Sequence, residues 1–176
     1  MFQAVAAGWH DFYIVAGTAA ATLVGLLFVG LSLHLRAVLS RSEVRSLARV
    51  TLANFGVVLL VSLFIVIPQG AASASPELIV TGAYSFVIVL PSLVSAGRSG
   101  TRTLRMTQLV MRFGFSALCY AGVIAAGALV GGHAFEAAFN ALVAVTIVLL
   151  VVSLRNSWDI LVGVGEATLG RDGAGS

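Results

Sequence analysis

Five long apolar stretches, almost free of charged side chains, dominate this sequence of 176 residues. They lie at about 12–35, 50–68, 78–97, 113–132 and 135–154. A helix needs roughly 20 residues to cross a hydrocarbon core about 30 Å thick, so each stretch predicts one membrane-spanning helix. We therefore expect an all-α membrane protein in which residues 1–162 form a single five-helix bundle. Residues 163–176 are predicted to form a flexible cytoplasmic tail.

The composition also favours a surface that faces lipid. Hydrophobic residues make up 59 % of the chain and charged residues only 10 %. A water-soluble domain carries about 25 % charged residues, so the charges here are too few to cover a water-facing surface. Cys119 is the single cysteine, which excludes an intrachain disulfide.

The positions of the arginines predict how the bundle is oriented. All ten basic residues are arginine, and with five spans every one falls on the same side of the membrane. The opposite side carries only Asp11, Glu77 and Glu136. Basic residues concentrate in cytoplasmic segments, so we expect the N-terminus outside and the C-terminus in the cytoplasm. The second and fourth helices are then expected to extend into the cytoplasm.

Local signals mark two of the helix boundaries. Gly131 and Gly132 are expected to separate the last two spans, because glycine accepts a positive φ at a helix end. Ser75 followed by Pro76 is typical of a helix start, so we expect Ser75 to cap the third helix. Pro91 is expected to kink that helix.

The first span carries two stripes of small residues. One consists of Gly17, Ala21 and Gly25, whose spacing allows close approach of another helix. The other is mildly polar, and we consider its members candidates for lining a path: Thr18, Thr22, Gly25 and Ser32. This second stripe has two interpretations. Its residues pack inside the bundle, or they line a water-accessible path or form a contact between protomers.

Two asparagines lie within predicted spans. Asn54 and Asn140 are both expected to make interhelical hydrogen bonds, each worth about 1 kcal/mol. Neither Asp nor Glu occurs at mid-membrane, where an ion-coupled transporter usually places an ionisable group. That pattern disfavours an ion-coupled transporter.

The predicted cytoplasmic extensions form a basic face. It consists of Arg41, Arg45, Arg49, Arg102, Arg105 and Arg112. These residues have three interpretations: they set the topology, they bind anionic lipid headgroups, or they form a positive vestibule at a pore mouth. Topology alone accounts for their number.

The sequence predicts neither an enzyme nor a metal protein. It contains no nucleotide-binding, metalloprotease or nucleophile motif, so no catalytic residue is predicted. His10, Asp11, His133 and Glu136 share the predicted outer side, but interfacial polar residues account for them better than a metal site does. We expect no metal, no cofactor and no nucleic-acid partner.

The first 35 residues resemble the opening of a family of small uncharacterised bacterial inner-membrane proteins. The matching residues are Trp9-His10-Asp11-Phe12, Gly25-Leu26-Leu27-Phe28-Val29 and Leu31-Ser32-Leu33. This resemblance implies a multi-pass protein of the bacterial inner membrane and implies no activity.

These observations predict a small homo-oligomeric channel or transport-type protein with a basic cytoplasmic mouth. Two alternatives stay open. One is an accessory or regulatory subunit that binds another membrane protein through its spans. The other is a membrane protein that binds anionic lipids.

Overall fold

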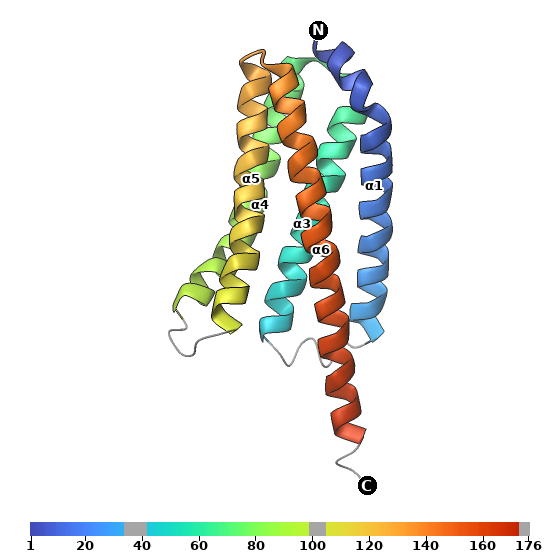
Figure 1. Cartoon of the computed structure of the whole chain (residues 1–176), viewed down its shortest axis with the longest axis vertical. Helices are drawn as coiled ribbons and strands as arrows, with labels where there is room; N and C mark the ends of the chain where they lie inside the picture. Colours follow the sequence, from blue (N-terminus) through green and yellow to red (C-terminus); the bar gives the residue numbers. More distant parts are fainter. Residues whose placement is uncertain (34–41, 99–104, 173–176) are drawn as a thin grey trace.

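The computed structural model describes residues 1–33, 42–98 and 105–172, and it gives side-chain surroundings for 1–33, 44–91 and 114–162. Within these ranges the chain forms five α-helices. They are α1 (Phe2–Leu33), α3 (Ser42–Val66), α4 (Ala71–Arg98), α5 (Arg105–Gly131) and α6 (Phe135–Asp172). The helices run up and down side by side (Figure 1).

All five described helices are long and apolar enough to cross a membrane. The predicted all-helical class with five spans is therefore confirmed, and it indicates a multi-pass membrane protein. We call one end of the bundle the arginine end, because Arg45, Arg49 and Arg155 lie there, where α3 begins and α1 ends. The opposite end carries the N-terminus and the α5–α6 turn (Figure 1).

The helices pack as a close pair joined to a group of three. The α4 and α5 helices contact each other more extensively than any other pair, and α1, α3 and α6 contact one another. The pair joins this group through the contacts of α5 with α6 and of α4 with α3. Half of the apolar window of α3 is buried (50 %), against 17 % of that of α1. Thus α3 is the central helix, and α1 exposes most of its surface.

The buried face of α6 recurs every three or four residues. It consists of Leu142, Thr146, Leu149, Ser153, Asn156 and Ile160. On α1 the spacing is similar, with Tyr13, Ala16, Ala20 and Leu27 buried. Such spacing is typical of helices that cross at a shallow angle, as in left-handed bundles.

Glycines bring α4 and α5 into close contact. A Cβ added at Gly82 of α4 would lie 2.9 Å from the Tyr120 carbonyl oxygen of α5. A Cβ added at Gly127 of α5 would lie 3.0 Å from the Ser75 carbonyl oxygen, and Ser75 Oγ donates a hydrogen bond to the Gly127 carbonyl at 2.8 Å. These backbones approach each other because no side chain separates them.

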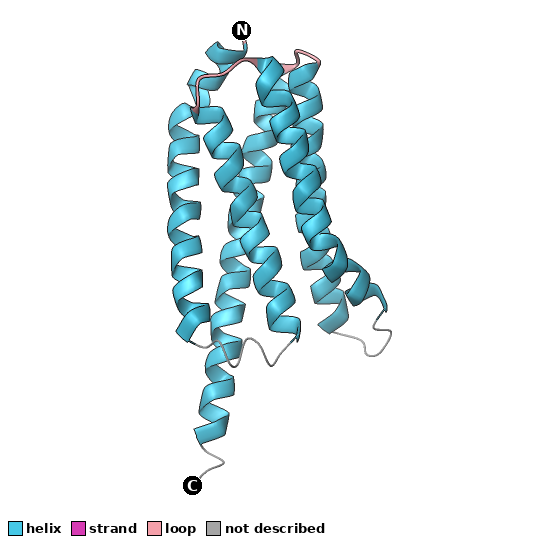
Figure 2. Ribbon diagram, turned by 180° about the vertical axis from the view of Figure 1, so that it is seen from behind, coloured by secondary structure: helices cyan, strands magenta, loops and turns pink. Residues whose placement is uncertain are grey.

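The prediction that Ser75 caps a helix is wrong. The α4 helix begins at Ala71, and the Gly70 carbonyl accepts hydrogen bonds from the amides of Ser73 and Ala74. Ser75 is inside the helix, where its hydroxyl serves the contact with α5. Pro91 also lies inside α4, whose last turns diverge from α3 (Figure 2).

The turn between α5 and α6 lies at the predicted place, but the residue with positive φ is His133 and not a glycine. The His133 amide donates to the Val130 carbonyl, and the Ala134 amide donates to the Leu129 carbonyl. This pair of bonds is a Schellman motif, in which the residue at the His133 position takes the left-handed conformation. Gly132 precedes that position by one residue.

Two helices, α1 and α6, extend furthest beyond the predicted spans. The α1 helix begins at Phe2, and the ring of Phe2 lies 5.6 Å from that of Phe135. The α6 helix continues to Asp172, so residues 163–172 are helical where we expected a flexible tail. Its 38 residues amount to about 57 Å, nearly twice a hydrocarbon core, and its end projects past the other helices (Figure 1).

Candidate functional site: a buried polar row

Five buried polar side chains lie along the interface of α1, α3 and α6. We call this set the polar row: Tyr13, Ser62, Thr146, Ser153 and Asn156. Each is at most 4 % exposed. The row therefore places hydroxyl and amide groups inside the bundle, where three helices meet.

The first half of the row lies where α1 meets α3 and α6. The Tyr13 hydroxyl of α1 faces Thr146 of α6. One turn further along α1, Gly17 lies against Ser62 of α3, since a Cβ added at Gly17 would be 2.9 Å from Ser62 Cβ. The absence of a side chain at Gly17 allows α3 to bring the Ser62 hydroxyl into this interface.

The second half of the row belongs to α6. Ser153 and Asn156 are 0 % and 1 % exposed, and they lie seven and ten residues beyond Thr146. At about 1.5 Å per residue, the row from Thr146 to Asn156 extends for about 15 Å along the helix. Buried apolar side chains, Leu149 of α6 and Val58 of α3, lie one turn beyond Thr146 and Ser62 respectively.

Most polar atoms of this row have no hydrogen-bond partner among the described residues. These atoms are Ser62 Oγ, Ser153 Oγ, Asn156 Nδ2 and Asn156 Oδ1, together with Tyr13 Oη, which lies toward Thr146 but outside hydrogen-bond geometry. A buried polar group left unpaired costs about 1–3 kcal/mol. Such groups are usually satisfied by water or by a ligand.

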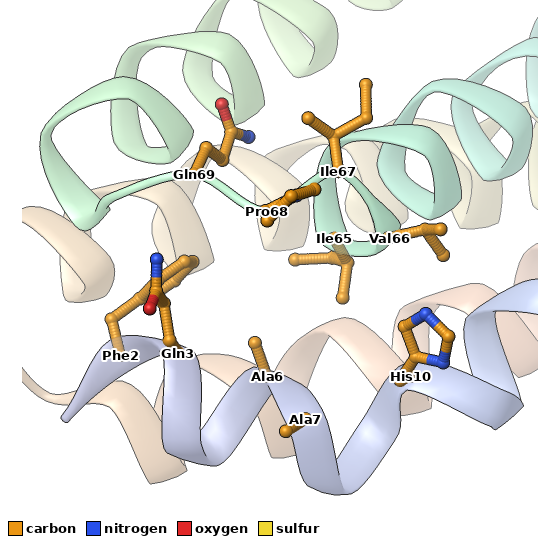
Figure 3. A pocket seen from close by; sticks show the side chains of 10 residues that line it. All are labelled: Phe2, Gln3, Ala6, Ala7, His10, Ile65, Val66, Ile67, Pro68 and Gln69. Carbon is orange, nitrogen blue, oxygen red and sulfur yellow. The ribbon is translucent and has the colours of Figure 1, made fainter.

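A pocket opens at the end of the bundle opposite the arginines. Its volume is about 190 Å³, and it lies between the start of α1 and the segment 65–69. In Figure 3 the side chains of Ala6 and His10 extend from α1 toward this segment. Tyr13 is three residues beyond His10, and Ser62 is three residues before Ile65, so the pocket lies about one turn from the polar row.

Gln69 closes one side of the pocket without presenting its amide to it. Its Nε2 atom donates to the Phe64 carbonyl at 2.9 Å and to Glu77 Oε2 at 2.8 Å. In Figure 3 the Gln69 side chain points away from α1. The polar groups facing the opening are therefore those of Gln3 and His10.

A second polar cluster joins α3 to α5 and is fully satisfied. Asn54 Nδ2 donates to Ser116 Oγ at 3.0 Å, and the Tyr120 hydroxyl donates to Asn54 Oδ1 at 2.6 Å. All three side chains are at most 1 % exposed. Asn54 thus makes the interhelical bonds that its position in the second span predicts.

The path-lining candidates of the first span lie outside the bundle. Thr18, Thr22, Gly25 and Ser32 are exposed on α1. The Thr18 and Thr22 hydroxyls donate to the carbonyls of Ile14 and Thr18, and Ser32 donates to Val29, so these groups are satisfied within their own helix. A path lined by them would have to run between protomers.

The predicted packing residues divide in the same way. Gly17 packs on α3 and Asn54 is buried, whereas Ala21, Gly25 and Asn140 are exposed on the single chain. Within one chain, close approach occurs instead at Gly30, Gly82, Gly122 and Gly127. A packing role for Ala21 and Gly25 between chains stays a prediction.

The basic face is described only in part. Arg45 and Arg49 are exposed on α3. Arg41 and Arg102 lie outside the described residues. Arg105 and Arg112 belong to the first turns of α5, whose side chains are not described. Arg49 also lines a groove between α3 and α4.

The residues considered for a metal site do not converge. His10 Nδ1 lies 3.3 Å from Asp11 Oδ1, while His133 contacts the ring of Phe135. Within the described ranges, no group of three or more His, Cys, Asp or Glu side chains is arranged to hold a metal ion.

Sequence reasoning missed most of the polar row. The three- and four-residue spacing of Thr146, Leu149, Ser153 and Asn156 could have placed these residues on one face. However, α6 is apolar on every face of its membrane-spanning part, so the spacing alone did not indicate which face was buried.

The chain matches no protein-family model, and it has no significant similarity to a curated protein or to a solved structure. The resemblance of its first 35 residues to bacterial inner-membrane proteins therefore stays a prediction.

Proposed function

We propose that this chain is a transport-type membrane protein that conducts water or a small uncharged polar solute along the polar row. The observation that carries this proposal is the set of buried hydroxyl and amide atoms without a partner in the described part of the chain. Left dry, the four residues concerned would each cost about 1–3 kcal/mol. A passing water or solute would supply the missing hydrogen bonds.

The chemistry of the row favours an uncharged solute. Its members present hydroxyls and one amide, which offer donors and acceptors but no charge. An ion moved into such a site would lose its hydration without gaining an opposite charge, at a cost of many kcal/mol. A neutral molecule that exchanges its hydrogen bonds with water for those of Ser and Asn loses much less.

The row has features of a gated path. The pocket beside His10 gives access from one end, about one helical turn from Tyr13. Leu149 and Val58 lie one turn beyond Thr146 and Ser62, and they form an apolar step, or constriction, within the row. Apolar constrictions of this kind can close a path by excluding water.

We further propose the bacterial inner membrane as the location, with the N-terminus outside and the arginine end in the cytoplasm. The segregation of all ten arginines supports this orientation. In this orientation α3 and α5 extend into the cytoplasm and contribute the arginines of a basic mouth. Homo-oligomers would form through α1, which exposes most of its surface.

Flux into liposomes tests the proposed path. Vesicles that contain the purified chain should take up water, glycerol or urea faster than empty vesicles in stopped-flow light scattering. Asn156→Leu should lower the rate because it removes the amide, and Leu149→Ala should raise it because it widens the apolar step. If wild-type vesicles are no faster than empty ones for all three solutes, the proposal is wrong.

A matched control separates the buried row from the exposed stripe of α1. Thr18→Val keeps the shape of the side chain but removes a hydroxyl that faces outward. Under our proposal this variant conducts like the wild type. Loss of flux in Thr18→Val with normal flux in Asn156→Leu would place the path between protomers instead.

The exposed face of α1 favours a second candidate function, that of an accessory subunit bound to another membrane protein. Thr18, Ala21 and Gly25 are small residues, so another helix could approach this face closely. A Cβ added at Gly25 would have no atom of the described chain within 4 Å. Gly25→Leu should then release a partner that copurifies stoichiometrically with the wild type. Absence of such a partner, together with solute flux by the isolated chain, would exclude this function.

A further inference from the structure

A groove between α3 and α4 opens on the outside of the bundle. Its volume is about 300 Å³. Its lining includes Arg49, Gly56 and Leu60 of α3 and Tyr84, Ser85 and Ile88 of α4. The groove lies apart from the polar row.

The groove exists because the two helices separate and because the α3 wall has a glycine, Gly56, where a side chain would otherwise fill the space. The α4 helix packs mainly on α5 and much less on α3, and its last turns diverge from α3 (Figure 2). Gly56 lies on the α3 wall, and a Cβ added there would meet no described atom within 4 Å. The space above Gly56 is therefore open.

The lining is almost entirely apolar, and its one formal charge lies at one end. The Ser85 hydroxyl donates to the Thr81 carbonyl at 2.8 Å, so it is satisfied within α4. Arg49 is exposed at the arginine end of the groove. The groove thus combines a hydrocarbon-like interior with a cation at its end.

The length of the groove matches one leaflet of a bilayer. Leu60 is eleven residues beyond Arg49 on α3, which corresponds to about 16 Å. Half of a hydrocarbon core about 30 Å thick is about 15 Å. When Arg49 lies at the level of the phosphates, the groove ends near the middle of the membrane.

We propose that this groove binds one anionic phospholipid, with an acyl chain over Gly56 and the phosphate on Arg49. Arginine pairs with phosphate through charge-assisted hydrogen bonds, and a basic residue near an anionic membrane surface contributes to lipid binding. An acyl chain fits this space better than a helix about 10 Å across does. The inference is independent of the proposed transport function.

Lipid titration followed by native mass spectrometry tests the site on the full chain in mild detergent. Phosphatidylglycerol should bind more tightly than phosphatidylcholine with the same acyl chains. Arg49→Gln should weaken the first phosphatidylglycerol about fivefold, the effect expected for one basic residue. Arg45→Gln removes the same charge one turn away, outside the groove, and should have a smaller effect.

A second pair of variants tests the acyl-chain part. Gly56→Leu should fill the groove and weaken binding of both lipids. Gly25→Leu is the matched control, because Gly25 has equally open surroundings but lies on α1. Equal effects of Arg49→Gln and Arg45→Gln, or of Gly56→Leu and Gly25→Leu, would overturn the proposal.

The wild-type chain offers a test that does not depend on any variant. Affinity for phosphatidylglycerol should rise as the acyl chain lengthens from eight carbons, and affinity independent of chain length would overturn the proposal. The same spectra report the oligomeric state. If Gly56→Leu abolishes a dimer while phosphatidylglycerol binding is unchanged, the groove holds a second copy and our proposal is wrong.

Discussion

The two buried asparagines of the bundle should respond oppositely to the same substitution. Asn54 and Asn156 are 0 % and 1 % exposed. Asn54 has hydrogen bonds to both Ser116 and Tyr120, whereas neither amide atom of Asn156 has a partner among the residues that the structure describes. Leucine has a similar size and no polar atom, so Asn→Leu at each position reports on the hydrogen bonds of the amide.

The expected free energies follow from these contacts. Asn54→Leu removes two interhelical bonds and leaves the buried Tyr120 hydroxyl unpaired, so we expect it to lower the free energy of unfolding by about 2 kcal/mol. Asn156→Leu removes two unpaired atoms, and we expect it to raise that free energy by about 1 kcal/mol after some cost of overpacking. The two variants should therefore differ by about 3 kcal/mol.

Unfolding in mixed micelles of increasing dodecyl sulfate fraction, followed by circular dichroism, measures this difference. Tyr120→Phe serves as a companion variant, because it removes the hydroxyl that donates a hydrogen bond to Asn54 Oδ1. It should lower the free energy of unfolding by about 1 kcal/mol. If both Asn→Leu variants are destabilised equally, Asn156 has a partner within the folded chain. The polar row would then lose its unpaired amide, and only unpaired hydroxyls would support the proposed transport function.

Three further predictions concern the turn, the close helix pair and the cysteine. His133→Gly should stabilise the chain by about 1 kcal/mol in the same assay, because glycine adopts a positive φ without strain; an unchanged midpoint would contradict this. Gly82→Val should destabilise strongly, since its Cβ would lie 2.9 Å from the Tyr120 carbonyl oxygen, while Gly25→Val should have little effect; similar midpoints would contradict the close packing of α4 on α5. Cys119 is 6 % exposed and should react with maleimide only after unfolding, and rapid labelling of the native chain would refute its burial.

The number of spans could be predicted because it depends on length and charge alone. A run of about 20 apolar residues signals a span whatever it packs against. The α5–α6 turn was also predictable, since Gly131 and Gly132 interrupt two such runs. The exact residue with positive φ was not, because the Schellman bonds from His133 and Ala134 fix it one position after the glycines.

The buried faces were harder to predict because lipid is as apolar as the interior of the bundle. In a water-soluble helix, the polar face indicates the outside. Here Thr18 and Thr22 face outward with their hydroxyls bonded to their own helix, while Thr146 and Ser153 face inward. Residue type therefore could not distinguish the two stripes, and only the packing of α1 and α6 on α3 does so.

The close contact of α4 with α5 has a mechanical consequence. Where Gly82 and Gly127 bring the two backbones together, any sliding of one helix past the other would produce steric clashes. The contact of α4 with α3 is much less extensive, so the α3–α4 contact resists sliding less than the α4–α5 contact does. A change in lateral pressure or bilayer thickness would therefore shift α4 against α3 before it shifted α4 along α5.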